Sequence, residues 1–165
     1  MVLVIRNLRR ERTLTAKAIR AMPTPRLVRP SGCHRQGAKK LKALVKFLDV
    51  QYGFSLERIF RRHVGEVREQ LLGIHGVGPE TADAILLYAG EKPSFAVDAY
   101  TRRVLERHGW VRAADGYDEV KRLCEENLSM EAKTYNEFHA LIVETGKRWW
   151  RLREAGAGNA RSRPL

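Results

Sequence analysis

A glycine-rich segment between two helical patterns constrains this chain more than any other feature. The segment reads Gly73-Ile74-His75-Gly76-Val77-Gly78. Glycine adopts positive φ at little steric cost and lets another backbone approach closely. The preceding residues 64–72 have a helical pattern with an apolar face that holds Val67, Leu71 and Ile74. The pattern predicts a tight hairpin after a helix.

A second helix is predicted to begin at Pro79, directly after the hairpin. Proline is favoured at the first helical position, because its missing N–H would have no intrahelical partner there. An apolar face with 3.6-residue spacing comes next, and Gly90 is expected to end the helix. The members of that face are Ala82, Ile85, Leu86 and Ala89. Free N–H groups and the positive end of the helix dipole make such a helix start suitable for binding a phosphate.

The hairpin has two interpretations. It is either an ordinary turn between two helices or a phosphate-binding hairpin that positions nucleic acid without reading its sequence. Gly76-Val77-Gly78 alone does not separate the two, because short motifs also match by chance. The choice therefore depends on the residues beyond the second helix.

Asp98 favours the nucleic-acid interpretation. It comes after the apolar run Phe95-Ala96-Val97 and precedes a helical pattern. An aspartate at a helix start is commonly a cap, which is worth about 1 kcal/mol. A carboxylate beside the anomeric carbon of a nucleotide stabilises an oxocarbenium-like transition state and orients water. An aspartate at this distance beyond such a hairpin is far less common than a simple cap.

Residues 64–108 resemble the helix–hairpin–helix and Gly-Pro-Asp loop of the endonuclease III superfamily of DNA glycosylases. A weaker resemblance runs from Arg29 to Trp150. The segments GPETADAILLYA and VDAYTRRV are most similar to the endonuclease III-related branch, which includes the 3-methyladenine glycosylase III type. The resemblance implies an all-α helix–hairpin–helix glycosylase fold, partial in this chain, over residues 1–150. The helix–hairpin–helix would occupy residues 64–90 and the catalytic-aspartate loop residues 91–98.

The resemblance also implies roles for individual residues. Asp98 is expected to be the catalytic aspartate, and double-stranded DNA with a damaged base is the expected partner. The backbone carbonyls of Leu72, Ile74 and Val77 are candidates to hold a monovalent cation. The residues expected to contact DNA are Gly73, Ile74, His75, Gly76, Val77, Gly78, Glu80 and Thr81.

Glu80 departs from the family pattern. Bifunctional relatives have a lysine at this position, which attacks the sugar and forms a Schiff base. A glutamate has no amine and cannot form one. We therefore expect a monofunctional glycosylase in which water is the nucleophile. Glu80 also suits the positive dipole at the start of a helix, and both interpretations can hold together.

The net charge of +12 favours a nucleic-acid partner. The positive charge is concentrated in residues 1–50 and 146–165, whereas residues 51–145 are slightly acidic. Basic flanks raise the affinity for DNA and its salt dependence, but the hairpin must bring DNA to Asp98. A helix is predicted over Gln36 to Val50, with Leu41, Leu44, Val45 and Leu48 on its core face. Its lysines Lys39, Lys40, Lys42 and Lys46 are expected to face solvent, with contact to DNA as the alternative.

The chain has only two cysteines, Cys33 and Cys124, with neither disulfide nor metal-site spacing. Cys124 is expected in the core. Many relatives begin a four-cysteine iron–sulfur loop where this chain has Gly146-Lys147-Arg148. An iron–sulfur cluster needs four thiolates, so we expect no cluster and no other cofactor.

Length and hydropathy bound the remaining expectations. At 165 residues the chain can form one domain or part of one. No apolar run approaches the about 20 residues of a membrane span, and the start is too short for a signal peptide. We expect a monomer without a membrane partner, in the cytoplasm and associated with the nucleoid if the source is prokaryotic.

Both ends depart from the resemblance. Met1 to Arg12 resembles the end of a helix that normally comes after two earlier ones, and the loop around Arg26-Leu27-Val28 is short. After Gly146 the composition shifts to Arg, Gly and Ala. We expect a truncated or frame-shifted reading frame with a disordered basic tail at 151–165. A non-catalytic helix–hairpin–helix DNA-binding module and an inactive truncated remnant are therefore the alternatives to an active glycosylase.

Other helices are predicted from apolar periodicity and caps. They span Leu14 to Ala21 with Thr13 or Thr15 as cap, Leu56 to Phe60, Tyr117 to Leu128 after Asp115 or Asp118, and Lys133 to Arg151. Tyr88, Tyr100 and Trp149 are candidates to stack on a flipped base, although core packing is the expected role of each.

Overall fold

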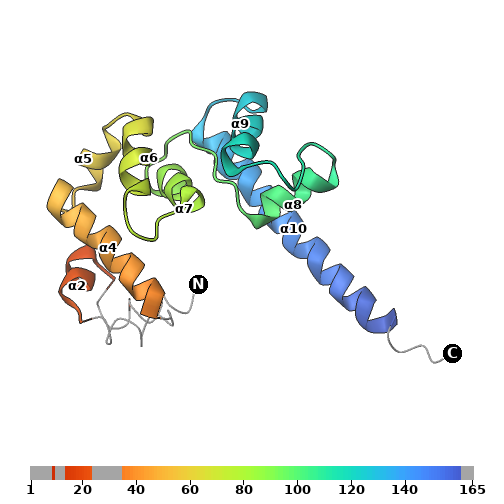
Figure 1. Ribbon diagram of the computed structural model, residues 1–165, viewed down its shortest axis with the longest axis horizontal. Helices are drawn as coiled ribbons and strands as arrows, with labels where there is room; N and C mark the ends of the chain where they lie inside the picture. Colours follow the sequence, from red (N-terminus) through yellow and green to blue (C-terminus); the bar gives the residue numbers. More distant parts are fainter. Residues whose placement is uncertain (1–8, 10–13, 24–34, 161–165) are drawn as a thin grey trace. The chain divides into compact units, whose positions relative to one another are not determined.

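The computed structural model describes residue 9 and the ranges 14–23 and 35–160, with side chains from 36 to 148 in the last range. It divides into two compact units, Met1–Gly78 and Pro79–Leu165, and each is described by itself. Helices account for all the regular structure in these ranges, as Figure 1 shows. The all-α prediction is confirmed. The predictions for Met1 to Arg12 and for the loop at 26–28 fall almost wholly outside the described residues.

The first unit contains four helices in its described part: α2 (Ala16–Ala21), α4 (Arg35–Tyr52), α5 (Leu56–Phe60) and α6 (Val64–Leu72). Side chains cap three of them. Thr15 accepts from the N–H of Ala18 at 3.2 Å, Ser55 from Arg58 and His63 from Gly65. Of the two caps predicted for this helix, Thr15 is the N-cap, and Thr13 lies outside the described residues. These bonds satisfy backbone donors that have no partner inside the helix.

Helix α4 packs against α2 through apolar side chains. Ile19, Met22, Ala38 and Val45 form the buried cluster, with Leu41 at its edge. Lys39, Lys40 and Lys46 are exposed, as the amphipathic pattern predicts, whereas Lys42 is half-buried. The face is narrower than expected, since Leu44 and Leu48 are only half-buried.

The second unit contains α7 (Pro79–Ala84), the π-helical turn η1 (Ile85–Ala89), α8 (Ala99–Arg107), α9 (Tyr117–Asn127) and α10 (Ala132–Ala160). Its core is a cluster of apolar side chains from η1, from the loops before and after α8, and from helices α8 to α10. Phe95 is fully buried and meets Tyr135 edge-on, with ring centroids 5.7 Å apart. The predicted core position of Cys124 is confirmed. The other buried members are Leu87, Val97, Leu105, Val111 and Val120.

Because of the π turn, the buried residues after Pro79 differ from the apolar face that was expected there. The N–H of Gly90 donates to the carbonyl of Ile85, five residues back, instead of four. Within this wider turn the side chains point in other directions than in a regular α-helix. Leu86 and Leu87 are buried, while Ala89 is exposed. Gly90 ends the turn with φ −96, and it is Glu91 that takes the left-handed conformation, with φ 49.

Two other boundaries differ from the prediction. Helix α9 is capped at Gly116, where Glu119 accepts from the backbone N–H at 2.6 Å. Asp115 instead accepts from the backbone and side chain of Arg112. Helix α10 extends to Ala160, beyond the expected end at Arg151. The disordered tail at 151–165 and the single domain over 1–150 stay predictions.

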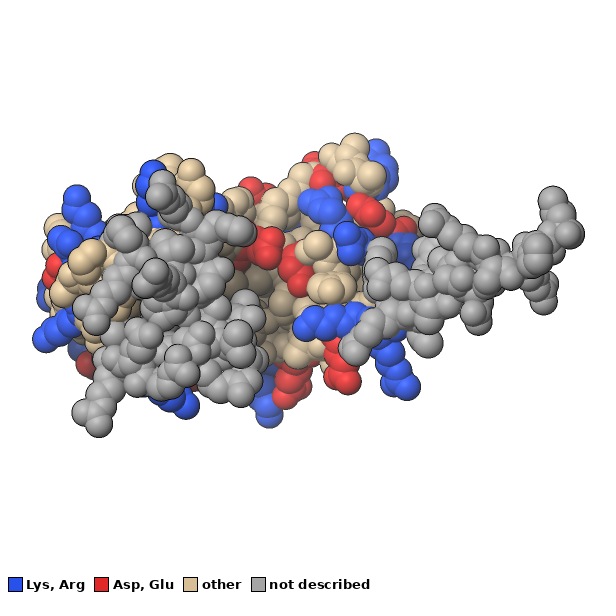
Figure 2. Space-filling model, turned by 90° about the horizontal axis from the view of Figure 1, so that it is seen from below, with Lys and Arg blue, Asp and Glu red and all other residues tan. Residues whose placement is uncertain are grey.

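The described surface is mixed in charge. Figure 2 shows lysine and arginine interspersed with aspartate and glutamate. None of the helices within the described ranges combines the length and apolar character needed to cross a membrane.

Candidate active site and DNA-binding hairpin

The hairpin alternates buried apolar side chains with exposed backbone. Ile74 and Val77 are each 8% exposed, whereas the three glycines and His75 are exposed. The N–H of Ile74 donates to Leu71 at 3.1 Å, and that of Val77 donates to Ile74 at 3.0 Å. Two apolar anchors and two backbone bonds thus fix a turn whose glycines face outward.

Gly76 is the hairpin glycine that needs its conformational freedom. Its φ is +85, where side chains with a Cβ are disfavoured. The side chain of Lys40 lies directly over it, because a Cβ at Gly76 would be 2.3 Å from Cγ of Lys40. The absence of a side chain at Gly76 therefore lets an α4 lysine lie against the hairpin.

Gly78 has a different environment. A Cβ built there meets no atom within 4 Å, so its backbone borders open space. Pro79 is the first residue of α7, as predicted, and Glu80 and Thr81 are exposed in its first turn. A glycine backbone that borders open space can be approached closely by another group.

Asp98 caps α8, as its position predicts. Its Oδ1 accepts from the N–H of Thr101 at 2.7 Å, and the aspartate side chain is 18% exposed. A carboxylate at a helix N-terminus is favoured by the dipole and by this charge-assisted bond. Its second oxygen, Oδ2, remains available for other contacts.

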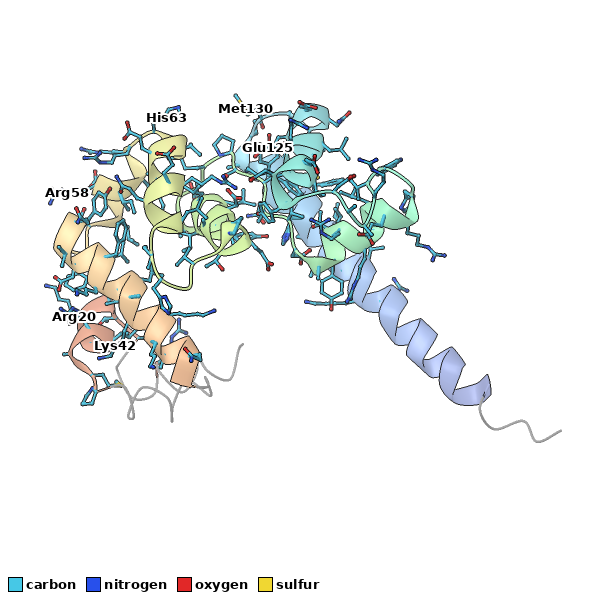
Figure 3. All side chains as sticks on the ribbon, viewed as in Figure 1. Arg20, Lys42, Arg58, His63, Glu125 and Met130 are labelled. Carbon is cyan, nitrogen blue, oxygen red and sulfur yellow. The ribbon has the colours of Figure 1, made fainter. Side chains whose placement is uncertain are left out.

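The apolar run before Asp98 is attached to α9 by hydrogen bonds. The N–H of Val97 donates to the hydroxyl of Tyr117 at 3.1 Å. The N–H of Phe95 donates to Glu125, at 2.8 Å, and its carbonyl accepts from Lys121, at 3.3 Å. Figure 3 labels Glu125 on α9. These bonds fix the backbone that carries the carboxylate.

Lys121 lies at the centre of a buried polar network. Its ammonium is 2.6 Å from Glu125, 2.9 Å from the hydroxyl of Ser94 and 3.4 Å from Asp83. Asp83 is fully buried and also accepts from Ser94 at 2.6 Å. A buried carboxylate is costly without such partners. No sequence pattern marks this network, since its four members come from three separate segments.

His139 is the site residue that the sequence analysis missed. It lies on α10, and its Nε2 is 3.7 Å from Oδ2 of Asp98. On its other side, the hydroxyl of Tyr88 contacts Nδ1. The expected core role of Tyr88 is wrong, because the residue is 46% exposed. Tyr100 is half-buried against Gly146, and the Trp149 side chain lies outside the described residues.

Burial controls the protonation of this group. It lowers the pKa of His139, although the carboxylates of Asp98 and Glu80 act in the opposite direction. Burial also raises the pKa of Tyr88, and the charge of Asp98 adds to that effect. The imidazole is therefore favoured in its neutral form and the phenol in its protonated form.

The predicted DNA-binding and catalytic residues fall in both units. Residues 73–78 belong to the first unit, and Glu80, Thr81 and Asp98 to the second. Within the second unit, Glu80 and Asp98 both act electrostatically on His139. Of these two carboxylates, Asp98 is the one with a direct contact to the histidine, at 3.7 Å.

The residues present do not fit an iron–sulfur cluster. Two cysteines cannot supply four thiolates, and Cys124 is buried in the core. Over the described ranges, no group of three or more histidine, cysteine, aspartate or glutamate side chains is arranged to hold a metal ion. The monovalent cation at the carbonyls of Leu72, Ile74 and Val77 stays a prediction.

Comparisons with known proteins support the family resemblance. Residues 4–130 match the model of the HhH-GPD superfamily of base excision DNA repair proteins. A Methanocaldococcus jannaschii protein that carries the name of a DNA repair glycosylase is 44% identical over 126 residues, covering 76% of this chain and 57% of the relative. Endonuclease III of Thermotoga maritima is 30% identical over 125 residues, covering 74% and 52%. The chain thus spans about half the length of these curated relatives.

Solved structures have the same fold. The crystal structure of Helicobacter pylori 3-methyladenine DNA glycosylase bound to 1,N6-ethenoadenine aligns with a TM-score of 0.78 and 30% identity, covering 89% of this chain and 76% of that one. A trapped covalent intermediate of endonuclease III with DNA aligns with a TM-score of 0.64 and 26% identity, covering 81% and 62%. The predicted fold is confirmed, and the chain belongs to the HhH-GPD superfamily of base excision DNA repair proteins.

Proposed function

We propose that this chain is a DNA glycosylase that hydrolyses the N-glycosidic bond of a damaged base, with Asp98 as its catalytic carboxylate. The observation that carries the proposal is the geometry of Asp98. A helix N-terminus fixes one carboxylate oxygen, and the other faces a buried histidine. A helix cap alone requires no such second partner.

The proposed mechanism depends on stabilising the positive charge that develops on the sugar. The target nucleotide first leaves the base stack, at a cost of a few kcal/mol that is smaller for a damaged base. The bond between C1′ and the base nitrogen then breaks, and its electron pair leaves with the base. The Asp98 carboxylate stabilises the resulting positive charge on the sugar and accepts a proton from the attacking water. The products are a free base and an abasic site.

Water is the proposed nucleophile because Glu80 occupies the lyase-lysine position. Glu80 is exposed in the first turn of α7 and carries no amine. Borohydride treatment during turnover should therefore trap no protein–DNA adduct. Glu80→Lys is the matched variant, since it introduces an amine at the same position. Trapping of the unchanged chain would contradict a monofunctional mechanism.

An alkylated purine is the proposed substrate class. Of the two solved structures described above, the one with the higher TM-score is a 3-methyladenine glycosylase, and its structure holds an ethenoadenine. N3- or N7-alkylated purines carry a positive charge, which the carboxylates of Asp98 and Glu80 would attract. Oxidised pyrimidines and mismatched thymine are the competing substrates to be assayed beside them.

Phosphates of the DNA duplex are proposed to contact the hairpin at 73–78 and the first turn of α7. The exposed glycines, the open space beside Gly78 and the exposed Thr81 support this placement.

We propose a monomer that works on chromosomal DNA without an iron–sulfur cluster. Iron analysis and absorbance near 400 nm test the missing cluster, and sedimentation tests the oligomeric state.

Base release from methylated duplex DNA tests the proposed function. The unchanged chain should release 3-methyladenine, and Asp98→Asn should lose release while keeping DNA affinity. Asparagine is also a good helix cap, so the melting temperature of this variant should be preserved. Binding without release by both proteins would identify a DNA-binding module instead. Neither binding nor release from a folded chain would identify an inactive remnant.

A further inference from the structure

We propose that His139 is a positioning residue that holds the Asp98 carboxylate by donating its Nε2–H to Oδ2, while Tyr88 fixes the imidazole from the other side. The inference deepens the proposed function and rests on it for its effect on rate. The three residues come from α10, the α8 cap and η1, and no sequence motif connects them.

The two oxygens of Asp98 have different neighbours. Oδ1 is occupied by the N–H of Thr101 at 2.7 Å, which fixes the carboxylate at the start of α8. Oδ2 faces His139, with Nε2 at 3.7 Å and both side chains largely buried, 12% exposed for His139 and 18% for Asp98. The proposed bond requires the two atoms to approach more closely than this, because N–H···O bonds are about 2.7–3.2 Å long.

Nε2 of His139 is a buried nitrogen without a hydrogen-bond partner in the described part of the chain. Such a group is costly unless it acquires a partner. The carboxylate oxygen of Asp98 is the charged acceptor that the structure places opposite it. The pairing therefore satisfies the histidine and orients the carboxylate together.

Tyr88 and Asp98 together favour one position for the hydrogen of His139. The Tyr88 hydroxyl contacts Nδ1, and burial raises the pKa of this phenol. The hydroxyl can donate or accept, but the Asp98 carboxylate opposite Nε2 accepts only, so a neutral imidazole is favoured with its hydrogen on Nε2 and with Nδ1 accepting from Tyr88. That hydrogen points toward Asp98.

Packing fixes the ring as well. The imidazole lies edge-on to Tyr88, with centroids 5.8 Å apart, and edge-on to the fully buried Phe95, at 6.1 Å. The charged groups that act on it are Asp98 and Glu80, and burial outweighs both in lowering the pKa of His139. A neutral imidazole that is fixed in place and donates a hydrogen bond can orient a carboxylate.

Single-turnover release of 3-methyladenine from methylated duplex DNA tests the effect on rate. His139→Ala should lower the rate about 10- to 100-fold, as loss of an orienting partner does elsewhere, with unchanged DNA affinity. His139→Gln should restore part of the rate, because its amide can donate. His108→Gln, at an exposed histidine, is the matched control.

A rate for His139→Ala equal to that of the unchanged chain would overturn the proposal. An equal loss in the alanine and glutamine variants would also overturn it, because a packing role predicts that result. These outcomes differ from failure of the proposed function, in which the unchanged chain and Asp98→Asn are both inactive.

A readout that needs no turnover tests the arrangement itself. ¹⁵N NMR of the histidines should show His139 neutral with its hydrogen on Nε2 at neutral pH. Its titration should move to lower pH in Asp98→Asn, because the carboxylate favours the imidazolium. Tyr88→Phe should increase the share of the Nδ1–H form. An Nδ1–H form in the unchanged chain, or a titration that ignores Asp98→Asn, would overturn the proposal even if no base is released.

Discussion

The side chain of Lys40 lies across the backbone of Gly76, so that a Cβ on the glycine would be 2.3 Å from Cγ, 2.7 Å from Cδ and 2.9 Å from Cε of the lysine. Three successive carbons of the lysine therefore run along the surface of the hairpin. A single helix residue thus contributes to both the shape and the charge of the hairpin surface.

Gly76→Ala should lower the free energy of unfolding by about 1–2 kcal/mol because alanine disfavours positive φ, and it should also weaken DNA binding. Gly53→Ala is the matched control, since Gly53 has φ +56 but no atom within 4 Å of its Cβ. Urea denaturation and fluorescence anisotropy with duplex DNA measure the two effects. Equal DNA affinity in both variants would show that the hairpin does not contact the duplex.

Lys40→Ala should reduce the salt dependence of DNA binding. Removal of one phosphate contact changes the slope of log K against log salt by about 0.9. Lys46→Ala, at another exposed lysine of α4, should leave the slope closer to that of the unchanged chain. If both substitutions change the slope equally, the contribution of Lys40 is diffuse charge and not a contact at the hairpin.

Lys121→Met should destabilise the second unit strongly. The substitution removes the cation beside the fully buried Asp83, and losing one partner of a buried pair costs about 3–5 kcal/mol. Arg122→Met removes a pair with Glu126 in which both side chains are more than half exposed, so its expected cost is about 0–1 kcal/mol. Denaturant unfolding monitored by tryptophan fluorescence compares them. Similar costs would mean that the network contributes little.

Gly146→Ala should destabilise the packing of α10 against α8. A Cβ there would lie 2.5 Å from Cδ1 of Tyr100, and overpacking of this kind costs about 1–3 kcal/mol. Gly65→Ala, in α6, should instead be neutral or stabilising, since its nearest contact is 3.4 Å and alanine favours helix. Thermal melts of the two variants and of the unchanged chain compare their melting temperatures. A melting temperature for Gly146→Ala at or above that of the unchanged chain would mean that Tyr100 moves aside freely.

Cys124 should make stability depend on alkaline pH. Burial raises the pKa of its thiol from 9.0 to about 11, with a smaller effect from Glu125. The thiol of the unfolded chain ionises first, so the contribution of this group is complete below pH 9 and is lost as pH rises toward 11. The difference in unfolding free energy between the unchanged chain and Cys124→Ala should shrink over that range. A constant difference would show that the thiol ionises equally in both states.

Local patterns predicted the helices of this fold well. Residues 64–72 have a 3.6-residue apolar period and form α6 with the predicted bounds, and Asp98 caps α8 as its position indicates. Caps and periodicity act over a few residues, which is why a sequence reveals them. The family resemblance, confirmed by the comparisons, came from the same short segment.

Contacts between distant segments could not be predicted in this way. His139 meets Asp98 and Tyr88 across 41 and 51 positions of the chain, and Lys121 meets Ser94 across 27. Nothing local marks such partners, because tertiary packing brings them together. The π turn escaped prediction for another reason. Its residues Ile85 to Ala89 are ordinary helix formers, and only the hydrogen bond from Gly90 distinguishes it.

The π turn also has a consequence for the length of this segment. A π turn contains one residue more than the α turn it replaces, so it accommodates one additional residue without breaking the helix. Deleting one residue between Ile85 and Ala89 would restore regular α winding and redirect the side chains inside the turn, while the two flanks keep their mutual orientation. Tyr88 would then no longer face His139. In an alignment of related chains, a one-residue gap at this turn should therefore coincide with loss of the tyrosine–histidine pair.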